Sequence, residues 1–325
     1  MTRADDGRAS ALAAARTLQT AVEAIVEPVF LVGGSVRDLM MGRQCQDYDF
    51  ATSRTPDEVE AAVRAAGRHP YLVGKRFGTV GFKVEGHLVE VTTFRAESYP
   101  DSSRRPEVRF LADLGDDLAR RDFTINAIAL HGDEAVDPFG GRDDIAARLV
   151  RAVGNAPDRF DEDPLRLLRA ARFASQLGFG IETRTHEAMR ENAGRILSVA
   201  RERRAAELDK LLVGAGAASA LRLLDETRLL GYLLPELVPL AESPGWEATL
   251  ASVEAAAPEA TERWSALLRD VAAPYLEGSV LSDEVTAALG AEIAERIGYG
   301  LRWPNARREA VTAGVLAARG DHAPH

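Results

Sequence analysis

Hydrophobic and polar residues follow two different spacings along this chain, and the change comes near residue 151. From about residue 28 to residue 151, β-branched and other apolar residues occur in short runs, separated by turns that contain Gly or Asp. Beyond residue 151 Leu, Ala and Arg recur at helical spacing. The pattern predicts an α+β protein, with a mixed-sheet domain followed by an all-helical part.

The predicted elements can be placed by residue number. An alanine-rich helix reaches about residue 26, and a second helix covers 56–66 with Thr55 as its N-cap. Strands are expected at residues 29–33, 47–52, 79–84, 87–94 and 126–130. We divide the chain into an N-terminal helix (1–26), a head domain (27–150), a helical neck and body (151–215) and a helical tail (216–325). A joint between helices is expected at residues 214–220.

Length and composition indicate an ordinary globular protein. The 325 residues are too many for one compact core, and 46% of them are hydrophobic and 28% charged. No stretch approaches the roughly 18 apolar residues of a membrane span, and the first residues lack the apolar core of a signal peptide. We therefore expect a cytoplasmic protein that contacts no membrane. The single cysteine, Cys45, excludes an intramolecular disulfide, and we interpret it as a packing residue.

The distribution of charge matters more than its sum. The net charge of −10 argues against nucleic-acid binding. Residues 164–204, however, contain nine arginines against four glutamates, a local balance of +5. Such a basic helical band can contact phosphates, although the count alone is equally compatible with a solvated helix face. The six histidines show no metal-ligand spacing.

Residues 31–52 combine a phosphate-binding pattern with a metal-binding one. An apolar strand enters the turn Gly33-Gly34, a short helix follows, and the next strand carries Asp47 and Asp49. Side chains two apart on a strand share a face, so both carboxylates point to one spot. Carboxylate oxygens suit Mg²⁺, and the backbone N–H groups of a glycine turn that opens a helix suit a phosphate. Taken alone, a Gly-Gly turn or an Asp-x-Asp pair is more often an ordinary turn or loop.

Glu90 is the best candidate for a third carboxylate. It alternates with Val89 and Val91, and therefore stands on the opposite face of its strand from these apolar neighbours. The pattern alone is equally compatible with an exposed strand glutamate.

In this order and at this spacing, residues 31–52 resemble the first motif of the class II tRNA nucleotidyltransferase and bacterial poly(A) polymerase family, within the polymerase β superfamily. Further segments resemble the later motifs in family order, at residues 116–130, 137–145, 160–182 and 202–208. The resemblance implies a polymerase β-like head and a helical body. It also implies nucleotidyl transfer assisted by two Mg²⁺ ions, with Asp47 and Asp49 as metal ligands and Glu90 as a further catalytic carboxylate.

The later motifs imply roles for particular residues. Arg121 and Asp122, with Asn126 close by, would handle the ribose and the triphosphate, because guanidinium is a forked donor for phosphate and carboxylate accepts from ribose hydroxyls. Residues 137–145 would form a hinge and brace between head and body, and residues 202–208 would brace the body helices. The residues expected to bind nucleotide are Gly33, Gly34, Arg37, Arg121, Asp122, Asn126, Asp163, Arg166, Arg169 and Arg172.

Base choice is implied at Glu162, Asp163 and Arg166, which match the family's Glu-Asp-x-x-Arg element. Asp163 and Arg166 are three residues apart and would share one face of a helix. Cytosine and adenine each present an amino donor beside a ring-nitrogen acceptor, which a carboxylate and a guanidinium can satisfy together. Uracil and guanine present a carbonyl instead, and leaving such groups unpaired costs about 1–3 kcal/mol each. Outside this motif context, a helix salt bridge would be the simpler interpretation.

The resemblance therefore implies ATP and CTP as substrates and the tRNA 3′ end as the partner. The Gly78-Thr79 step is similar to the CCA-adding branch rather than the poly(A) polymerases. Family enzymes that add only cytidines lack the charged loop found here between residues 94 and 116, which favours addition of the terminal A. The charged residues of this predicted flexible loop are Arg104, Arg105, Glu107 and Arg109. Three alternatives stay open: poly(A) tailing, a catalytically inactive RNA-binding scaffold, and nucleotidyl transfer to a small molecule or protein.

The tail carries a weaker resemblance. Residues 263–272 and 290–311 look like helices of an HD phosphohydrolase domain, but Arg269 stands where the metal-binding histidine belongs. A guanidinium has no lone pair for a cation, so we expect a structural or RNA-contacting tail without a catalytic metal.

Overall fold

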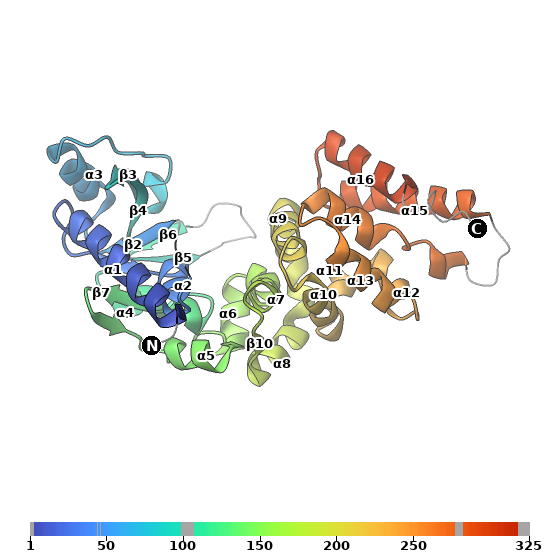
Figure 1. The fold of residues 1–325 in the computed structure, drawn as a ribbon, viewed down its shortest axis with the longest axis horizontal. Helices are drawn as coiled ribbons and strands as arrows, with labels where there is room; N and C mark the ends of the chain where they lie inside the picture. Colours follow the sequence, from blue (N-terminus) through green and yellow to red (C-terminus); the bar gives the residue numbers. More distant parts are fainter. Residues whose placement is uncertain (1–2, 44, 46, 99–106, 277–281, 318–325) are drawn as a thin grey trace. The chain divides into compact units, whose positions relative to one another are not determined.

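The computed structural model describes residues 3–43, 45, 47–98, 107–276 and 282–317. The chain forms two compact units, Met1–Glu162 and Asp163–His325, which we call the head unit and the helical unit. The head unit, blue to green in Figure 1, contains the main sheet, and the helical unit, yellow-green to red, is built almost entirely of helices. The α+β fold class is thus confirmed. The finer division into neck, body and tail remains a prediction.

The head unit alternates short helices and strands. Its α-helices are α1 (Arg3–Glu23), α2 (Gly34–Met40), α3 (Pro56–Ala65), α4 (Leu114–Ala119), α5 (Gly141–Ala147) and α6 (Ala156–Glu162), and its 3₁₀ turns include η1 (Lys75–Phe77) and η3 (Thr124–Asn126). Its strands are β1 (Phe30–Val32), β2 (Tyr48–Thr52), β3 (Thr79–Val84), β4 (His87–Thr93), β5 (Arg95–Ser98), β6 (Glu107–Phe110), β7 (Ala129–His131), β8 (Glu134–Val136) and β9 (Leu149–Val150).

Six strands form one mixed sheet in the order β3-β4-β2-β1-β7-β8. Strands β2 and β4 run parallel, and the other neighbouring pairs run antiparallel. In the parallel pair Asp49 lies opposite Glu90. Strands β5 and β6 form a separate antiparallel hairpin, in which Arg95 lies opposite Phe110.

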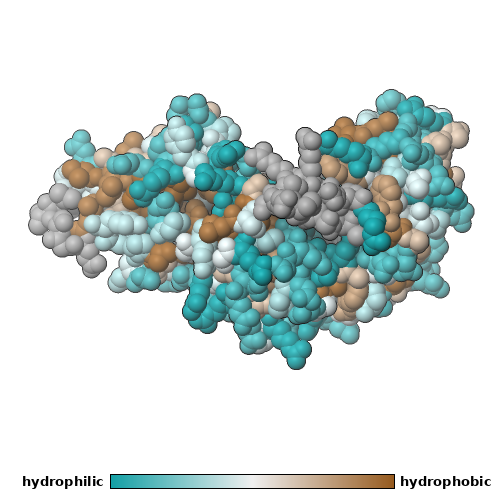
Figure 2. Space-filling view, turned by 180° about the vertical axis from the view of Figure 1, so that it is seen from behind, coloured by the Kyte–Doolittle hydropathy of each residue, from teal (hydrophilic) through white to brown (hydrophobic). Residues whose placement is uncertain are grey.

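The two faces of this sheet bury different sets of side chains. One face packs against α1, α2 and α3 through a large apolar cluster that includes Val22, Leu39, Val63 and the fully buried Phe50. Each such side chain contributes about 1.5–3 kcal/mol when taken out of water. The opposite face carries a smaller cluster that includes Leu118 of α4. The surface seen in Figure 2 is correspondingly mostly hydrophilic, with hydrophobic residues scattered among polar ones.

Most predicted head elements are present, with corrections. The helix α3 begins after Thr55, the predicted N-cap, and the structure adds a capping box between the Thr55 hydroxyl and Glu58. The strand expected at 126–130 was wrong at its start, because Thr124–Asn126 forms a 3₁₀ turn and β7 begins at Ala129. The strands β5, β6 and β8 were not predicted. Cys45 packs against the core, and burial is the main cause that raises the pKa of its thiol to about 11.

The helical unit consists of a series of helices with short connections. Its α-helices are α7 (Leu165–Leu177), α8 (Thr183–Asn192), α9 (Arg201–Leu212), α10 (Ala217–Glu226), α11 (Leu229–Leu233), α12 (Val238–Ala241), α13 (Trp246–Ala255), α14 (Ala260–Leu268), α15 (Asp283–Gly300) and α16 (Asn305–Ala317). It also contains the 3₁₀ turns η4 (Ala193–Ser198), η5 (Pro235–Leu237) and η6 (Ala273–Leu276), and the two-residue strand β10 (Gly180–Ile181), which was not predicted. The joint predicted at 214–220 is shorter in the structure, because α9 ends at Leu212 and α10 already begins at Ala217.

A polar node at Asp209 holds α9, α14 and α16 together. The carboxylate of Asp209 accepts two hydrogen bonds from Arg307, each 2.6 Å long, and one of 2.9 Å from the indole N–H of the fully buried Trp264. The Arg307 guanidinium also lies 4.6 Å from the ring centroid of Trp303, a cation–π contact. Arg269, at the end of α14, donates to Ser252 and Asp270. No helix in the described part of the chain is both long and apolar enough to cross a bilayer.

Candidate active site

Asp49 and Glu90 form a carboxylate pair on adjacent parallel strands. They are register partners in β2 and β4, so their side chains lie next to each other on one face of the sheet. Both are exposed, whereas their strand neighbours Phe50 and Val91 are buried on the other face. The alternation of the sequence therefore brings together two of the three carboxylates predicted for catalysis. Asp47 lies in a bend just before β2 and is also exposed.

The electrostatic setting of Asp49 favours the binding of a cation. Partial loss of hydration raises the pKa of Asp49, and the negative charge of Glu90 raises it further. The guanidinium of Arg121 lowers this pKa, and Asp47 adds a smaller upward effect. Carboxylates held this close repel each other, and a divalent cation between them would remove the repulsion.

The donor set fits magnesium, although the described residues contain no preformed metal cage. Within that part of the chain, no three His, Cys, Asp or Glu side chains lie close enough together to hold a metal ion. Asp49 and Glu90 supply only oxygen donors, which hard cations prefer. Mg²⁺ keeps several waters and commonly uses one or two carboxylates together with substrate phosphates, so the pair fits a metal that arrives with a nucleotide.

The Gly33-Gly34 turn joins β1 to α2 beside this pair. Gly33 has φ 72° and ψ −137°, a conformation that residues with a side chain avoid. A Cβ atom at Gly33 would lie 3.0 Å from Nη1 of Arg121, so that guanidinium lies directly against the turn. The backbone of the predicted phosphate site and the predicted phosphate-binding arginine are therefore adjacent.

We expect Gly33→Ala to weaken nucleotide binding as well as lower stability. The strained backbone should cost about 1–3 kcal/mol of unfolding free energy, and the new methyl group would push Arg121 away. Gly86→Ala is the matched control, because Gly86 also has a positive φ (79°) but no atom lies within 4 Å of its Cβ position. Urea unfolding and calorimetric titration with ATP separate the two effects. Equal nucleotide affinities in the two variants would contradict the placement of Gly33 and Arg121 at the nucleotide.

Arg37, Asp122 and Asn126 form a connected polar group next to the turn. The buried Arg37 donates from Nη1 to Oδ1 of Asn126 over 2.8 Å, and it pairs with Asp38 over 2.9 Å. The amide of Asn126 in turn donates to Oδ1 of Asp122 over 3.0 Å. The structure thus links the predicted nucleotide-binding residues Arg37, Asn126 and Asp122 by direct hydrogen bonds.

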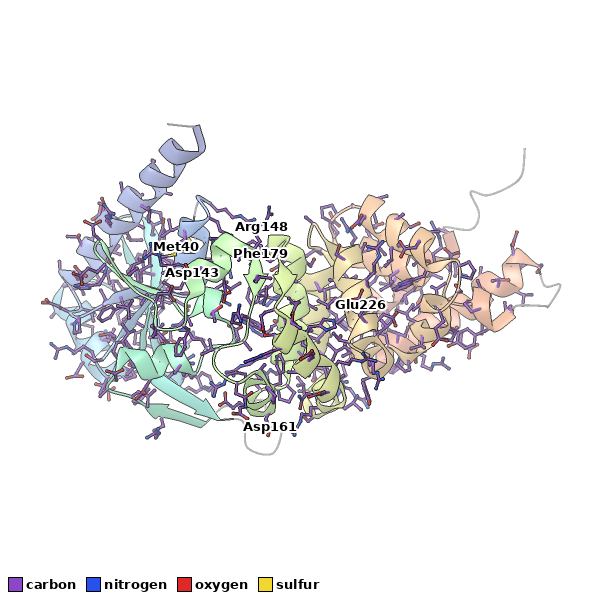
Figure 3. The ribbon with its side chains drawn as sticks, turned by 90° about the horizontal axis from the view of Figure 1, so that it is seen from below. Met40, Asp143, Arg148, Asp161, Phe179 and Glu226 are labelled. Atoms are coloured by element: carbon purple, nitrogen blue, oxygen red, sulfur yellow. The ribbon has the colours of Figure 1, made fainter. Side chains whose placement is uncertain are left out.

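Residues 137–145 form a brace inside the head unit. The carboxylate of Asp137 accepts from the backbone N–H groups of Gly141 and Arg142, which begin α5. A Cβ atom at Gly141 would lie 2.1 Å from the carbonyl oxygen of Thr124, so only glycine permits this packing of α5 on η3. The helix α5 also contacts α2; Met40, at the end of α2, and Asp143 of α5 are labelled in Figure 3. The role predicted for this segment, a hinge and brace between head and body, remains a prediction.

In the helical unit, Asp163 is placed differently from the prediction. It is not part of the helix that carries Arg166, because α6 ends at Glu162 and α7 begins at Leu165, although its backbone carbonyl accepts from the N–H of Arg166 over 3.0 Å. Asp163 lies in the break and is 7% exposed; its Oδ1 accepts from the backbone N–H of Leu165. Its Oδ2 accepts from Arg203 of α9 over 2.7 Å. The carboxylate is therefore fixed from two sides, and the second partner was not predicted.

Arg169 and Arg172 meet a buried carboxylate of α9. Arg172 pairs with Glu207 over 2.8 Å and Arg169 over 3.9 Å, and both guanidinium groups lie near the ring of Phe173. Glu207 thus links α9 to α7, and Arg203 links α9 to Asp163; the bracing role that the resemblance implies for residues 202–208 remains a prediction. Glu162 pairs with Arg159 within the head unit.

The charged loop falls largely outside the described residues. Arg104 and Arg105 are not described, and only the backbone of Glu107 is, within β6. Arg109 is described and exposed. The role of these four residues remains a prediction.

Sequence reasoning missed Asp117, which lies beside the site on α4. Its carboxylate is 1% exposed and pairs with Arg120 over 2.7 Å and with Arg121 over 3.1 Å. The signal was available, because an acidic residue three and four positions before two arginines on a helix predicts such pairs.

Comparison with known proteins identifies the family. A family model described as the poly(A) polymerase head domain matches residues 29–151, and one described as a probable RNA- and SrmB-binding site of polymerase A matches residues 178–240. The solved CCA-adding enzyme of Bacillus stearothermophilus in complex with CTP has a TM-score of 0.65 and 32% identity, covering 100% of this chain and 80% of that one. A tRNA nucleotidyltransferase complexed with a primer tRNA and an incoming ATP analog has a TM-score of 0.61 and 25% identity, covering 91% and 84%.

The chain therefore belongs to the family of tRNA nucleotidyltransferases and poly(A) polymerases. Its curated relatives include the CCA-adding enzyme of Geobacillus thermodenitrificans, 44% identical over 275 residues, which is 82% of this chain and 65% of the relative. That of Bacillus velezensis is 44% identical over 245 residues, 74% of this chain and 59% of the relative. The chain thus spans less than two thirds of the length of these two relatives.

Proposed function

We propose that this protein adds C and A, or the terminal A alone, to the 3′ end of tRNA, using CTP and ATP. The observation that carries the proposal is the carboxylate pair Asp49–Glu90 beside the guanidinium of Arg121 and the Gly33 turn. Negative groups for metal ions and positive groups for phosphates, side by side on a rigid sheet, suit phosphoryl transfer. The names of the relatives support tRNA as the acceptor.

The Mg²⁺ ions would be held by the carboxylates of three residues, Asp47, Asp49 and Glu90. When bound, Mg²⁺ neutralises charge on the triphosphate and favours the ionised form of the attacking hydroxyl. Because β2 and β4 are packed on a fully buried apolar layer, the protein holds Asp49 and Glu90 in place before substrate arrives.

Arg121 and the Gly33-Gly34 turn are assigned to the triphosphate. The transfer joins the 3′-hydroxyl of the RNA to the α-phosphorus and releases pyrophosphate, so negative charge must be held on the leaving group. Arg121 offers forked N–H donors, and the turn offers backbone N–H groups. Asp122, linked to Asn126 and Arg37, supplies a carboxylate for the ribose hydroxyls.

Base choice is assigned to Asp163 and Arg166 in the helical unit. The ion pair with Arg203 and the hydrogen bond from Leu165 hold the Asp163 carboxylate in a fixed orientation. An oriented acceptor of this kind takes a hydrogen bond from the amino group of cytosine or adenine, whereas uracil presents a carbonyl oxygen at that position. Selection of both C and A by one protein surface follows from the edge that these two bases share.

We expect extension assays with three acceptors to test the proposal. The pure protein is incubated with tRNAs that end at the discriminator base, at C and at CC, with each labelled nucleotide in turn. The tRNA ending in CC should gain one A, and the complete enzyme should also add C to the two shorter acceptors. Long tails of A on any RNA would instead establish poly(A) polymerase activity, which the match to the poly(A) polymerase head domain makes the main competitor. No incorporation with any acceptor would favour the inactive scaffold.

A further inference from the structure

Asp117 is the most deeply buried charged group beside the site, and the proposed function gives it no role. It lies on the short helix α4 and is 1% exposed. Its Oδ1 accepts from Arg120 over 2.7 and 2.9 Å and from the backbone N–H of Arg95 over 3.2 Å, and its Oδ2 accepts from Arg121 over 3.1 Å. Both carboxylate oxygens of Asp117 therefore accept hydrogen bonds, Oδ1 from Arg120 and Arg95 and Oδ2 from Arg121.

The carboxylate of Asp117 stays ionised despite its burial. Burial acts to raise its pKa, but the positive charges of Arg120 and Arg121 outweigh that effect, and the pKa lies below the ordinary aspartate value. A buried charge of this kind is costly unless it is well paired, and each partner keeps the others in place.

Arg121 is held at two points, and both set its direction. Its Nη2 donates to Asp117, and its Nη1 donates to the backbone carbonyl of Asn126 over 3.2 Å. Nη1 also lies 3.0 Å from the position that a Cβ atom would take at Gly33. The positive charge of Arg121 lowers the pKa of Asp49. A guanidinium has five N–H donors, so after these two bonds others remain for a phosphate.

We propose that Asp117 is a positioning residue for nucleotide binding: it holds the guanidinium of Arg121 against the Gly33 turn, in the orientation that meets the triphosphate. The inference rests on the proposed function, because it takes Arg121 as a triphosphate ligand. Without Asp117, Arg121 would keep its charge but lose one of its two fixed contacts. It would then have to be ordered each time a nucleotide binds, at a cost in affinity.

The test is a double-mutant cycle on nucleotide affinity. Asp117→Asn keeps the size of the side chain and an acceptor for the Arg95 N–H. It should weaken binding of CTP and ATP about tenfold, at the lower end of the losses seen when a residue that orients a ligand-binding side chain is removed. In an Arg121→Ala background the same change should have no further effect on the nucleotide Kd, because the group through which it acts is gone. Calorimetric titration of each nucleotide, without tRNA, gives the four constants.

Two further measurements separate positioning from a purely structural role. Asp117→Asn should lower the melting temperature in both backgrounds, so a loss of stability alone does not support the proposal. Asp144→Asn is the matched control, because Asp144 is also buried and pairs with Arg151 and Thr124; it should lower the melting temperature and leave the Kd unchanged. An unchanged Kd in Asp117→Asn, or an equal loss in both backgrounds, would overturn the proposal.

Failure of the proposed function gives a different result. A wild-type protein that binds CTP and ATP with an Asp117-dependent affinity, but extends no tRNA, would refute the transfer activity and leave the positioning role intact. A wild-type protein that binds neither nucleotide would overturn both the proposed transfer activity and the positioning role of Asp117.

Discussion

Asp49→Asn is expected to abolish nucleotide incorporation and, at the same time, to raise the melting temperature. Loss of a carboxylate from the proposed metal site should lower the rate about a thousandfold or more, as loss of a central electrostatic contact does in other active sites. The gain in stability follows from the raised pKa of Asp49, since a raised carboxylate pKa means that the fold disfavours the ionised form.

The sign of the stability effect can be checked against pH. The folded state holds the Asp49 proton to higher pH than the unfolded chain does, so wild-type stability falls as pH rises from the ordinary value of 3.8 through the raised pKa. The higher melting temperature of Asp49→Asn relative to wild type should therefore be present at neutral pH and shrink towards pH 3.8. Thermal melts with a chelator present, and incorporation assays with Mg²⁺, measure the two effects. Asp143→Asn, an exposed change on α5, is the control. Retained incorporation in Asp49→Asn would refute the metal assignment.

Asp163→Ala is expected to relax the choice of base. It removes the acceptor that the amino group of C or A would use, and it leaves Arg203 without its carboxylate. Discrimination against UTP and GTP should fall by roughly tenfold or more, since one lost pairing is worth about 1–3 kcal/mol. The ratio of kcat/KM for CTP and ATP to that for UTP and GTP measures the effect on a tRNA acceptor.

The control for Asp163→Ala must lower stability without touching the base site. Asp209→Asn meets this need, because Asp209 pairs with Arg307 and Trp264 in the same unit. It should reduce the melting temperature and leave the nucleotide preference unchanged. If Asp163→Ala kept the wild-type preference, base choice would have to reside in other residues.

The head site could be predicted largely from local patterns. Alternation along β2 and β4 was enough to turn Asp49 and Glu90 away from the apolar core, since side chains in strands alternate. The parallel register that makes them neighbours joins residues about 40 positions apart, which no local pattern specifies. The strands β5 and β8 were missed because they are short and lack clear alternation.

The segment proposed to read the base shows where local sequence patterns are not enough. Placing Asp163 and Arg166 on one helix ignores Pro164, although a proline disfavours helical geometry in the residue before it. Asp163 leaves the helix at this point, which frees its side chain to reach Arg203, 40 residues further along. Pro164 was therefore a readable signal for the break, but the partner on α9 depends on tertiary packing.

The Asp209 node has a consequence for how the protein is made. Arg307 follows Asp209 by 98 residues, so α9 leaves the ribosome long before α16 does. Until then the Asp209 carboxylate lacks its arginine, and the face of α14 that packs against α16 is uncovered. The head unit, whose core lies within residues before 163, can fold during this interval. The helical unit thus exposes apolar surface of α14 until α16 has been made, and such transiently exposed surface favours aggregation.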